Sequence, residues 1–358
     1  MVQFFPLTVT AVERETRDAV VLSLEPPAEQ RAAFAFTPGQ YLTFRKTLEG
    51  EELRRSYSLC SGRGEGCLKV GIKKVPGGLF STWANEGLAP GETLEAMAPM
   101  GSFHAPLEAA GRRHHLFFAA GSGITPVLSL IKTTLAEEPG SRVTLVYGNR
   151  SSSSIMFREA LEDLKNLNLG RFTLLHVLSR ESQEIDLFNG RIDAEKCRQL
   201  FTYWIDPKEV DLAFICGPQS MMTAVHGALV EAGLAEERIK FELFASAQQG
   251  RARAAAQQAA AAAAAERCQV TLQLDGLTRS FEMPKGQVSL LDAALAEGLD
   301  VPYACKGGVC STCRAMVLEG EVDMDANFAL EDYEVRRGYV LTCQSFPASD
   351  RLVVDYDQ

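Results

Sequence analysis

"CKGGVCSTC", residues 305–313, packs three cysteines among glycines and small hydroxyl side chains. A fourth cysteine, Cys343, follows after a gap of 29 residues. Three ligands in one loop and a distant fourth form an asymmetric set, whereas a zinc site more often pairs two short C-x2-C knuckles. The spacing therefore predicts a metal cluster held by Cys305, Cys310, Cys313 and Cys343.

The order Cys-x4-Cys-x2-Cys with a distant cysteine is the spacing of plant-type [2Fe-2S] proteins. Gly307, Gly308, Ser311 and Thr312 suit such a loop. A chain folded around sulfide needs close backbone approach and N–H groups directed at sulfur. An ordinary glycine turn would explain these small residues but not the cysteines. Zinc, or chance spacing, stays open as the alternative.

The sequence around the cysteines has the pattern of a small mixed domain. Residues 268–284 read as two alternating strands around an Asp-Gly turn, residues 289–299 as a short amphipathic helix and residues 351–356 as a closing strand. About the last 90 residues thus resemble a β-grasp ferredoxin domain. The resemblance implies a carrier of single electrons.

Length and composition indicate a modular soluble protein. The 358 residues suffice for two or three domains, and 46% are hydrophobic and 23% charged. No apolar run reaches the length of a bilayer span, and "MVQFFPLTVT" at the N-terminus lacks the pattern of a signal peptide. We expect a cytoplasmic protein without a membrane partner, in which the nine cysteines form no disulfide framework.

The net charge of -10 argues against a nucleic-acid partner, whose phosphates need a basic face. From Arg267 onward, 15 acidic residues stand against 8 basic ones, a net charge of -7. An acidic, solvated surface is the common explanation of such an excess. Some of these carboxylates could also form a docking face.

The first hundred residues predict an antiparallel barrel. Short strand patterns at residues 5–16, 19–27, 38–46 and 67–75 are separated by proline, glycine and charged turns. Within this region "RRSYSLCS", residues 54–61, places Arg55, Tyr57 and Ser58 on one extended segment. An arginine can pair with a pyrophosphate, an aromatic ring can lie on an isoalloxazine, and a hydroxyl can reach a flavin nitrogen.

"PGGLFSTWANEG", residues 76–87, follows soon after. Gly77 and Gly78 lead into a short predicted helix whose N-terminal N–H groups could hold a phosphate, with Ser81 in the first turn. In isolation, a glycine turn before a helix explains the pattern equally well.

A third module begins at residues 114–135, "HHLFFAAGSGITPVLSLIKTTL", which read as a buried strand, a glycine loop and a helix. Thr125 suits the helix cap and Pro126 its first turn. Gly121 and Gly123 form a phosphate cradle, although Pro126 stands where the usual dinucleotide fingerprint has its third glycine. Strands and helices then alternate to about residue 229, which predicts a doubly wound sheet.

"CGPQSMM", residues 216–222, follows an apolar strand of this sheet. Cys216 is thereby placed at the carboxyl edge, where open α/β sheets bind ligands. A buried cysteine is more often only a small apolar residue, and that explanation would prevail if the motif stood alone.

The motifs R-x-Y-S, G-G-x-x-S, G-x-G-x-T-P and C-G-P together resemble the ferredoxin-NADP reductase superfamily. The resemblance implies FAD, with Arg55 on the pyrophosphate, Tyr57 packed on the flavin ring and Ser58 near its N5 atom. It also implies that the flavin phosphates lie in the loop from Gly77 and Gly78 to Ser81.

For the nicotinamide nucleotide the resemblance implies a site formed by Gly121, Gly123, Thr125 and Pro126, with Cys216, Gly217 and Pro218 beside the nicotinamide. Glu242 would lie near the hydride-transfer centre, and Phe244 would cover the flavin face. Glu242 and Phe244 could equally be a strand carboxylate and a core aromatic residue.

These modules predict domain limits for the whole chain. We expect an FAD-binding β-barrel at residues 1–105, an NAD(P)-binding α/β domain at 106–246 and a [2Fe-2S] domain at 267–358. Residues 247–266 are an alanine-rich linker, for which a semi-rigid helical spacer competes with a flexible tether.

The domain order and the stretches "LRRSYSLCS", "VPGGLFSTW" and "ALEDYEVRRGYVLTCQS" resemble the reductases of phenylacetyl-CoA epoxidase systems. Reductases of ring-hydroxylating oxygenases, steroid hydroxylases and hybrid-cluster proteins share much of this pattern. The resemblance implies that NAD(P)H gives a hydride to FAD, and that single electrons then pass through the [2Fe-2S] cluster to an oxygenase, here a multisubunit diiron epoxidase. A flavin and iron–sulfur redox sensor is the non-enzymatic alternative.

The nucleotide is expected to be NADPH, with NADH as the alternative. Ser179 and Arg180 follow a predicted strand, as Ser-Arg does in plant ferredoxin-NADP reductases, and could grip a 2'-phosphate. Arg150 and the serines at 151–154 could add to that grip, whereas Glu181 would repel a phosphate. A strand end also carries Ser and Arg for solvation alone.

Overall fold

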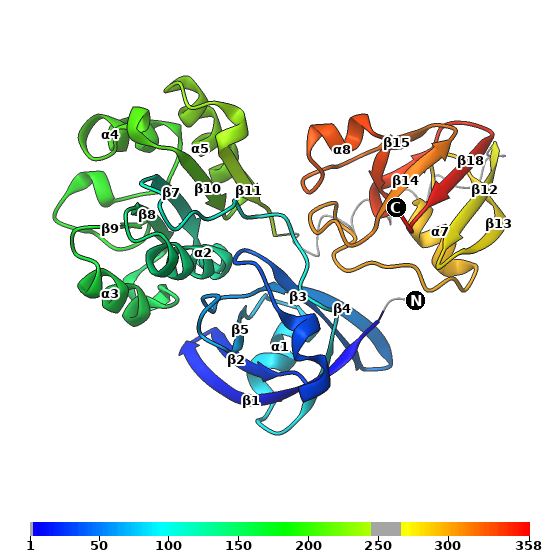
Figure 1. The fold of residues 1–358 in the computed structure, drawn as a ribbon, viewed down its shortest axis with the longest axis horizontal. Coiled ribbons are helices and arrows are strands. Elements are labelled where there is room, and N and C mark those ends of the chain that lie inside the picture. The colour runs from blue at the N-terminus through cyan, green and yellow to red at the C-terminus, as the bar shows by residue number, and fades with distance from the viewer. Residues whose placement is uncertain (1–2, 245–265) are drawn as a thin grey trace. The chain divides into compact units, whose positions relative to one another are not determined.

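The computed structural model describes residues 3–244 and 266–358 (Figure 1). It contains two compact units, of which one comprises Phe5–Leu53 with Tyr57–Phe244 and the other carries the C-terminal residues from 266 onward. Within the described ranges, no helix combines the length and the apolar character that crossing a bilayer requires.

The N-terminal sheet confirms the predicted antiparallel barrel. Its strand order is β4-β3-β6-β1-β2-β5, and an isolated bridge between Leu59 and Val70 links the end of β4 to β5. The Cys60 N–H donates to the Lys69 carbonyl at the same place (2.8 Å), so the two edges of the sheet meet. The strands are β1 (Phe5–Thr16), β2 (Ala19–Glu25), β3 (Tyr41–Leu48), β4 (Glu51–Ser58), β5 (Leu68–Lys73) and β6 (Thr93–Ala96).

Alternating apolar residues fill this barrel, as a period of two residues requires. Leu7 and Val9 of β1 are fully buried while their neighbours face outward. Helix α1 (Leu79–Glu86) contributes Phe80 and Ala84 to the same core. The loop before α1 is therefore anchored by the packing of its helix against the barrel.

The second sheet is fully parallel, with the order β11-β10-β7-β8-β9. Because β7 lies between β8 and β10, the order of strands reverses there, which confirms the doubly wound prediction. In Figure 1, α2 and α3 lie on one side of the sheet and α4 and α5 on the other. The elements are β7 (His114–Ala120), α2 (Ile124–Glu137), β8 (Arg142–Asn149), α3 (Arg158–Leu167), β9 (Phe172–Leu178), α4 (Ala194–Tyr203), β10 (Leu212–Cys216), α5 (Gln219–Glu231) and β11 (Ile239–Glu242).

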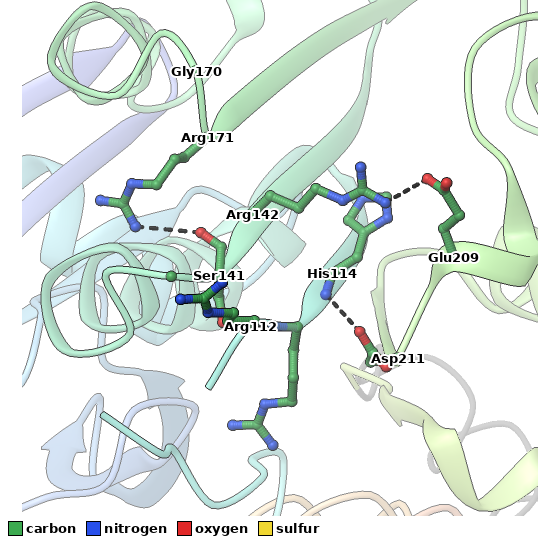
Figure 2. A pocket seen from close by; sticks show the side chains of 10 residues that line it. Arg112, His114, Ser141, Arg142, Gly170, Arg171, Glu209 and Asp211 are labelled. Atoms are coloured by element: carbon green, nitrogen blue, oxygen red, sulfur yellow. Dashed lines mark hydrogen bonds and ion pairs between the residues drawn. The ribbon is translucent and has the colours of Figure 1, made fainter. Parts of the chain in front are cut away.

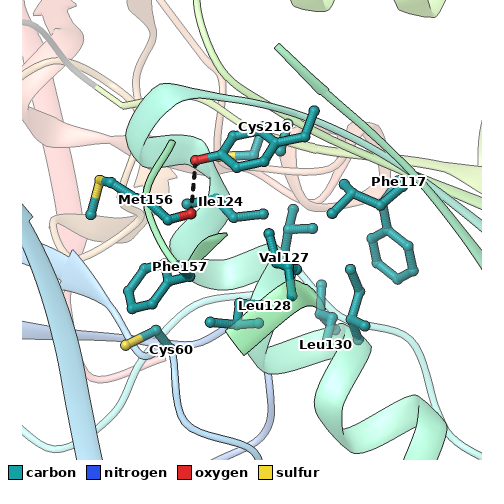
Figure 3. Close-up of a cluster of buried hydrophobic side chains, with 14 of the residues drawn as sticks. Cys60, Phe117, Ile124, Val127, Leu128, Leu130, Met156, Phe157 and Cys216 are labelled. Carbon is teal, nitrogen blue, oxygen red and sulfur yellow. Dashed lines mark hydrogen bonds between the residues drawn. The ribbon is translucent and has the colours of Figure 1, made fainter. Parts of the chain in front are cut away.

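Helix α2 lies at the centre of a large apolar cluster (Figure 3). Ile124, Val127 and Leu128 are buried there together with Phe117 of β7 and Cys216 of β10. The start of α2 also touches the backbone after β10, because a Cβ at Gly123 would lie 2.2 Å from the carbonyl oxygen of Cys216. Only glycine permits this approach.

The C-terminal unit has a mixed five-stranded sheet of order β13-β12-β18-β14-β16, in which β12 and β18 are parallel. This topology confirms the predicted β-grasp domain. The elements are β12 (Arg267–Leu274), β13 (Leu277–Pro284), α7 (Leu290–Ala296), β14 (Arg314–Glu319), β15 (Val322–Met324), α8 (Asp332–Arg336), β16 (Tyr339–Leu341), β17 (Ser345–Pro347) and β18 (Arg351–Asp355).

The expected turn and helix of this unit are present. Asp275 and Gly276 have φ angles of 52° and 71°, the left-handed pair that a two-residue hairpin turn needs. Ser289 caps α7, since its hydroxyl accepts from the Asp292 N–H at 3.1 Å. Most of the alanine-rich linker predicted for residues 247–266 lies outside the described residues.

The contact at Gly123 gives a stability test. In Gly123→Ala the new methyl group meets a backbone carbonyl, so we expect a loss of about 1–3 kcal/mol or more in unfolding free energy. Gly227, in the exposed interior of α5 with open space around it, is the control. Gly227→Ala should gain about 0.5–1 kcal/mol. Chemical denaturation measures both, and an unchanged Gly123→Ala protein would contradict the packing described.

Candidate functional site

A crevice is expected where β7 and β10 end, because ligands of doubly wound sheets bind outside the carboxyl ends of the strands at the switch point. The turn from Gly121 to Gly123 follows β7 there, and Cys216 ends the neighbouring strand. Gly217 and Pro218 then lead into α5, with Pro218 at its N-cap. The structure thus brings the glycine loop and the Cys-Gly-Pro motif together.

The expected cap of α2 was wrong in one detail. The helix begins at Ile124 with Gly123 as its N-cap, so Thr125 lies inside the first turn. The Thr125 hydroxyl instead donates to the Ser122 carbonyl at 3.0 Å and so closes the glycine turn. Pro126 does lie in the first turn, where its missing N–H breaks no helical hydrogen bond.

Ser58, Cys216 and Glu242 meet at one place, although they come from three distant parts of the sequence. Cys216 and Glu242 are register partners on the parallel strands β10 and β11. The Ser58 hydroxyl, at the end of β4, donates to the Glu242 carboxyl group at 3.1 Å. The barrel and the parallel sheet therefore contribute to the same group of side chains.

Burial governs the protonation of this group. It raises the pKa of Glu242 to about 8, while the hydrogen bond from Ser58 opposes the rise. Burial also raises the pKa of the Cys216 thiol well above its ordinary value, and the nearby Glu242 raises it further. The Cys216 thiol is therefore protonated at pH 7, and the Glu242 carboxyl group is shifted toward its neutral form.

Direct contacts between the barrel and α2 hold Ser58 in place. The Ser129 hydroxyl donates to the Ser61 carbonyl at 2.7 Å, and the Arg63 N–H donates to the Thr133 hydroxyl at 3.1 Å. Both bonds join α2 to the segment that directly follows β4. The position of Ser58 is thus set by tertiary packing and not only by its strand.

The expected flavin residues lie on β4 and at the start of α1. Tyr57 stacks on Phe80 of α1, with ring centroids 5.6 Å apart. Arg55 donates to the Arg54 carbonyl at 2.7 Å. Both Arg55 and Tyr57 are half-buried, so part of each side chain is open to a ligand.

The loop before α1 has the shape of a phosphate cradle. Gly77 has a φ of 72°, and Gly78 is the N-cap of α1 without a side-chain cap. The Ser81 hydroxyl accepts from the Val75 N–H at 3.0 Å and donates to the Gly78 carbonyl at 3.2 Å. Ser81 therefore shapes the loop, and the first N–H groups of α1 keep no side-chain partner.

The residues expected at the 2'-phosphate follow β8 and β9. Ser179 and Arg180 are exposed, and the Arg180 N–H donates to the Arg150 carbonyl at 2.8 Å. Glu181 accepts from both the N–H (2.7 Å) and the hydroxyl (2.9 Å) of Ser152. Ser152 is thus already occupied by a carboxylate, which also fixes where that carboxylate points.

Phe244 lies just beyond β11 and is 38% exposed, so the structure places it at the surface and not in the core. Leu243, beside it, is buried. Of the two explanations considered for Phe244, the structure therefore contradicts the core aromatic residue.

The four cysteines of the predicted cluster lie in the C-terminal unit, in the loop before β14 and directly after β16. Cys310, Cys313 and Cys343 are buried, and Cys305 is half-buried. A hydrogen bond from Cys310 lowers the pKa of Cys305, while a hydrogen bond with Cys305 raises the pKa values of Cys310 and Cys343. Cys305 therefore lies beside Cys310 and Cys343, and Cys343 also lies beside Cys313.

The backbone of the cysteine loop is built for close approach. The Gly307 N–H donates to the Cys305 sulfur at 3.3 Å, as expected for a loop that directs N–H groups at sulfur. Gly308 has a φ of 76°, and a Cβ there would lie 2.7 Å from the Ala326 carbonyl oxygen. Across the described ranges, no three His, Cys, Asp or Glu side chains converge as ligands of one metal ion would.

Sequence reasoning missed one hydrogen-bonded chain behind these cysteines. The Thr342 hydroxyl donates to the Cys313 carbonyl at 3.0 Å and accepts from the Tyr356 hydroxyl at 2.7 Å. The only available signal was the place of Thr342 directly before Cys343. Tyr356 gave none, because its contact joins residues far apart in the sequence.

The pocket in Figure 2 lies at the opposite, amino-terminal edge of the parallel sheet and has a volume of about 330 Å³. Several charged side chains in and around it are paired within the fold. Arg142 pairs with Glu209 at 2.5 Å, Arg113 pairs with Glu138, and Asp211 accepts from the His114 N–H at 2.7 Å. We therefore assign this pocket a structural role.

Three family models match the chain. An oxidoreductase FAD-binding domain matches residues 6–105, an oxidoreductase NAD-binding domain matches 117–227, and a 2Fe-2S iron-sulfur cluster binding domain matches 272–348. A component of the 1,2-phenylacetyl-CoA epoxidase of Escherichia coli K12 is 44% identical over 357 residues, which cover 100% of this chain and 99% of that protein.

The chain belongs to the ferredoxin-NADP reductase superfamily, in the branch with a C-terminal [2Fe-2S] domain. This reductase is also 35% identical to the ferredoxin reductase component of the 3-ketosteroid-9-alpha-monooxygenase of Rhodococcus rhodochrous, over 98% of the chain and 96% of that protein. The solved structure of phthalate dioxygenase reductase shares its fold, with a TM-score of 0.59, 24% identity and coverage of 98% of both chains.

The reductase is therefore an NAD(P)H-dependent oxidoreductase that uses FAD, a [2Fe-2S] cluster and a nicotinamide nucleotide. The match to the cluster-binding family excludes zinc as the alternative metal bound by the cysteines. An enzyme is likewise favoured over a redox sensor.

The raised pKa of Glu242 predicts a pH dependence of stability. Between its ordinary value of 4.5 and about 8, the unfolded carboxyl group is ionised while the folded one keeps its proton. Folded protein then binds more protons than unfolded protein, so stability falls as the pH rises through this window. Glu242→Gln should remove this part of the fall.

Thermal unfolding of both proteins from pH 5 to 8 measures the effect. The melting temperature of the wild type should decline relative to that of Glu242→Gln as the pH rises. Parallel curves would show that the carboxyl group is not held neutral.

Proposed function

We propose that this reductase delivers electrons to a multisubunit diiron epoxidase that acts on phenylacetyl-CoA. The likeness to a component of the 1,2-phenylacetyl-CoA epoxidase of Escherichia coli, 44% identity over the whole chain, carries the proposal. We also propose that the protein lies in the cytoplasm. The domains are taken as residues 1–105, 106–246 and 267–358, with the linker at 247–266.

FAD is proposed to lie along β4 and the loop before α1. Arg55 would pair with the pyrophosphate, and the N–H groups after Gly78 would hold a phosphate through the loop shaped by Ser81. Tyr57, backed by Phe80, offers a fixed aromatic face to the flavin ring. Phe244, exposed at the end of the parallel sheet, would cover the other flavin face.

The nicotinamide nucleotide is proposed to occupy the crevice between the turn at Gly121–Gly123 and Cys216–Pro218. Thr125 and Pro126 shape the turn that faces the pyrophosphate, and Gly123 allows the two loops to meet. The close packing of these loops excludes water from the end of β10.

When bound, FAD accepts a hydride from the nicotinamide nucleotide and the [2Fe-2S] cluster passes electrons on singly. The chain contributes the buried Ser58 and Cys216 and the half-buried Glu242 beside the proposed crevice. Neutral side chains there avoid a fixed charge next to the nicotinamide. Ser58 can donate a hydrogen bond to a flavin nitrogen if it turns away from Glu242. The protonated Glu242 carboxyl group can donate its proton.

A reductase of a steroid or ring-hydroxylating oxygenase is the second candidate. The observation in its favour is the 35% identity to a 3-ketosteroid-9-alpha-monooxygenase reductase component over nearly the whole chain. The identity is lower than that to the epoxidase component, and the test below separates the two.

The first test concerns the cluster ligands, which we propose to be Cys305, Cys310, Cys313 and Cys343. Cys313→Ala should abolish electron transfer to the epoxidase while the reduction of ferricyanide by the flavin stays largely intact. Cys67→Ala, at a half-buried cysteine outside this set, is the matched control and should behave as the wild type.

The assay uses purified epoxidase and, in parallel, a ring-hydroxylating oxygenase. Turnover with the oxygenase and none with the epoxidase would overturn the proposed partner. A Cys313→Ala protein that keeps the cluster spectrum and full turnover would overturn the ligand assignment.

The second test concerns the nucleotide, which we propose to be NADPH, bound at its 2'-phosphate by Ser179 and Arg180. The nearby Glu181 carboxylate is held by two hydrogen bonds from Ser152, and its negative charge opposes this grip. A charge-assisted contact is worth about 1.5–3 kcal/mol, so Arg180→Ala should lower the NADPH preference roughly ten- to a hundredfold.

The measurement is kcat/KM for NADPH and NADH in the wild type, Arg180→Ala and the control Arg198→Ala on α4. A wild type that favours NADH, or the same ratio in Arg180→Ala, would contradict the assignment.

A further inference from the structure

The C-terminal end of the chain reaches behind the cysteine loop. Tyr356 directly follows β18, and its N–H donates to the Gln273 carbonyl of β12 at 3.0 Å, so its backbone is fixed by the sheet. Its ring packs against the core of the C-terminal unit. The hydroxyl group at the far end of the ring donates to the Thr342 hydroxyl at 2.7 Å.

Thr342 passes this hydrogen bond on to the backbone of a cysteine. Its hydroxyl donates to the Cys313 carbonyl at 3.0 Å, and its own N–H donates to the same oxygen at 3.1 Å. A carbonyl oxygen can only accept, so the Thr342 hydroxyl must receive its hydrogen bond from Tyr356. The direction of both hydrogen bonds, from Tyr356 to Thr342 and from Thr342 to Cys313, is thereby fixed.

These hydrogen bonds join the segment that carries Cys343 to the loop that carries the other three cysteines. Thr342 precedes Cys343 and is fully buried, and it bonds to Cys313 across 29 residues of sequence. The Tyr356 hydroxyl is thus linked to the Cys313 backbone through a single side chain.

We propose that Tyr356 is a positioning residue for the [2Fe-2S] cluster, which acts through Thr342 on the Cys313 carbonyl and sets the reduction potential of the cluster. The inference rests on the proposed ligation by Cys313 and Cys343. It adds a residue outside the four cysteines, at a position that their spacing does not reveal.

The sign of the effect follows from the direction of the hydrogen bonds. A carbonyl oxygen near the cluster disfavours the extra negative charge of the reduced form, and donors to that oxygen weaken the effect. Hydrogen bonds in a chain polarise one another, so the Tyr356 hydroxyl strengthens the donation by Thr342. Removal of the phenol hydroxyl should therefore make the potential more negative.

Tyr356→Phe in the full-length holoprotein tests this directly. The one-electron equilibrium constant for cluster reduction should fall by up to about tenfold, which corresponds to 59 mV. Redox titration followed by visible absorption and by electron paramagnetic resonance gives the potential and the spectrum of the reduced cluster. Tyr333→Phe, which removes a hydroxyl from a 55% exposed ring of the same domain, is the matched control and should leave both unchanged.

Two variants of Thr342 distinguish an effect of the hydrogen bond from an effect of side-chain packing. Thr342→Val keeps the shape and removes the hydroxyl, so it should shift the potential in the same direction, whereas Thr342→Ser keeps the hydroxyl and should retain the wild-type potential. Tyr356→Phe added to Thr342→Val should produce little further change, because the two act through one chain.

Wild-type potentials in Tyr356→Phe and Thr342→Val would overturn the proposal, as would a shift toward more positive values. Loss of the cluster in both variants, with Tyr333→Phe and Thr342→Ser intact, would support a positioning role. Cys313→Ala is measured alongside, and a normal cluster spectrum in that variant would overturn the ligation itself and not merely the role of Tyr356.

Discussion

The close approach of Gly123 to the carbonyl oxygen of Cys216 is the constraint on which the proposed nucleotide site depends. A Cβ at Gly123 would lie 2.2 Å from that oxygen, so only glycine lets α2 begin directly against the end of β10. The apolar cluster around Ile124 and Val127 then holds the helix in this place. The glycine turn after β7 and the Cys-Gly-Pro motif after β10 lie together because these two strands, nearly a hundred residues apart in the sequence, end side by side.

The second consequence of this packing is the shared group of Ser58, Cys216 and Glu242. It forms only when the barrel and the parallel sheet are in contact, and bonds such as that from Ser129 to the Ser61 carbonyl keep them so. Burial shifts Glu242 toward its neutral form, and Ser58 is its hydrogen-bond donor. In the proposed nicotinamide site, a carboxyl group shifted toward its neutral form would add little charge beside the nucleotide.

Features with local signals could be predicted from the sequence. The strands of the barrel and the hairpin turn at Asp275 and Gly276 follow from alternation and turn chemistry, and the cysteine spacing indicated an iron–sulfur cluster. The helix cap at Thr125 was wrong because Gly123, held by a tertiary contact, already starts the helix. The bonds of Glu181 to Ser152 and of Tyr356 to Thr342 join distant segments, for which a single sequence carries no periodic signal.

The central claim is that this chain takes an electron pair from a nicotinamide nucleotide and hands on single electrons through its cluster. Anaerobic titration of the purified protein with NADPH, followed by visible absorption and electron paramagnetic resonance, measures it most directly. The account predicts that the flavin absorption bleaches, that the signal of a reduced [2Fe-2S] cluster appears, and that the chain takes up the electron pair of the flavin plus one further electron. Bleaching of the flavin with a cluster that stays oxidised at every NADPH concentration would contradict it.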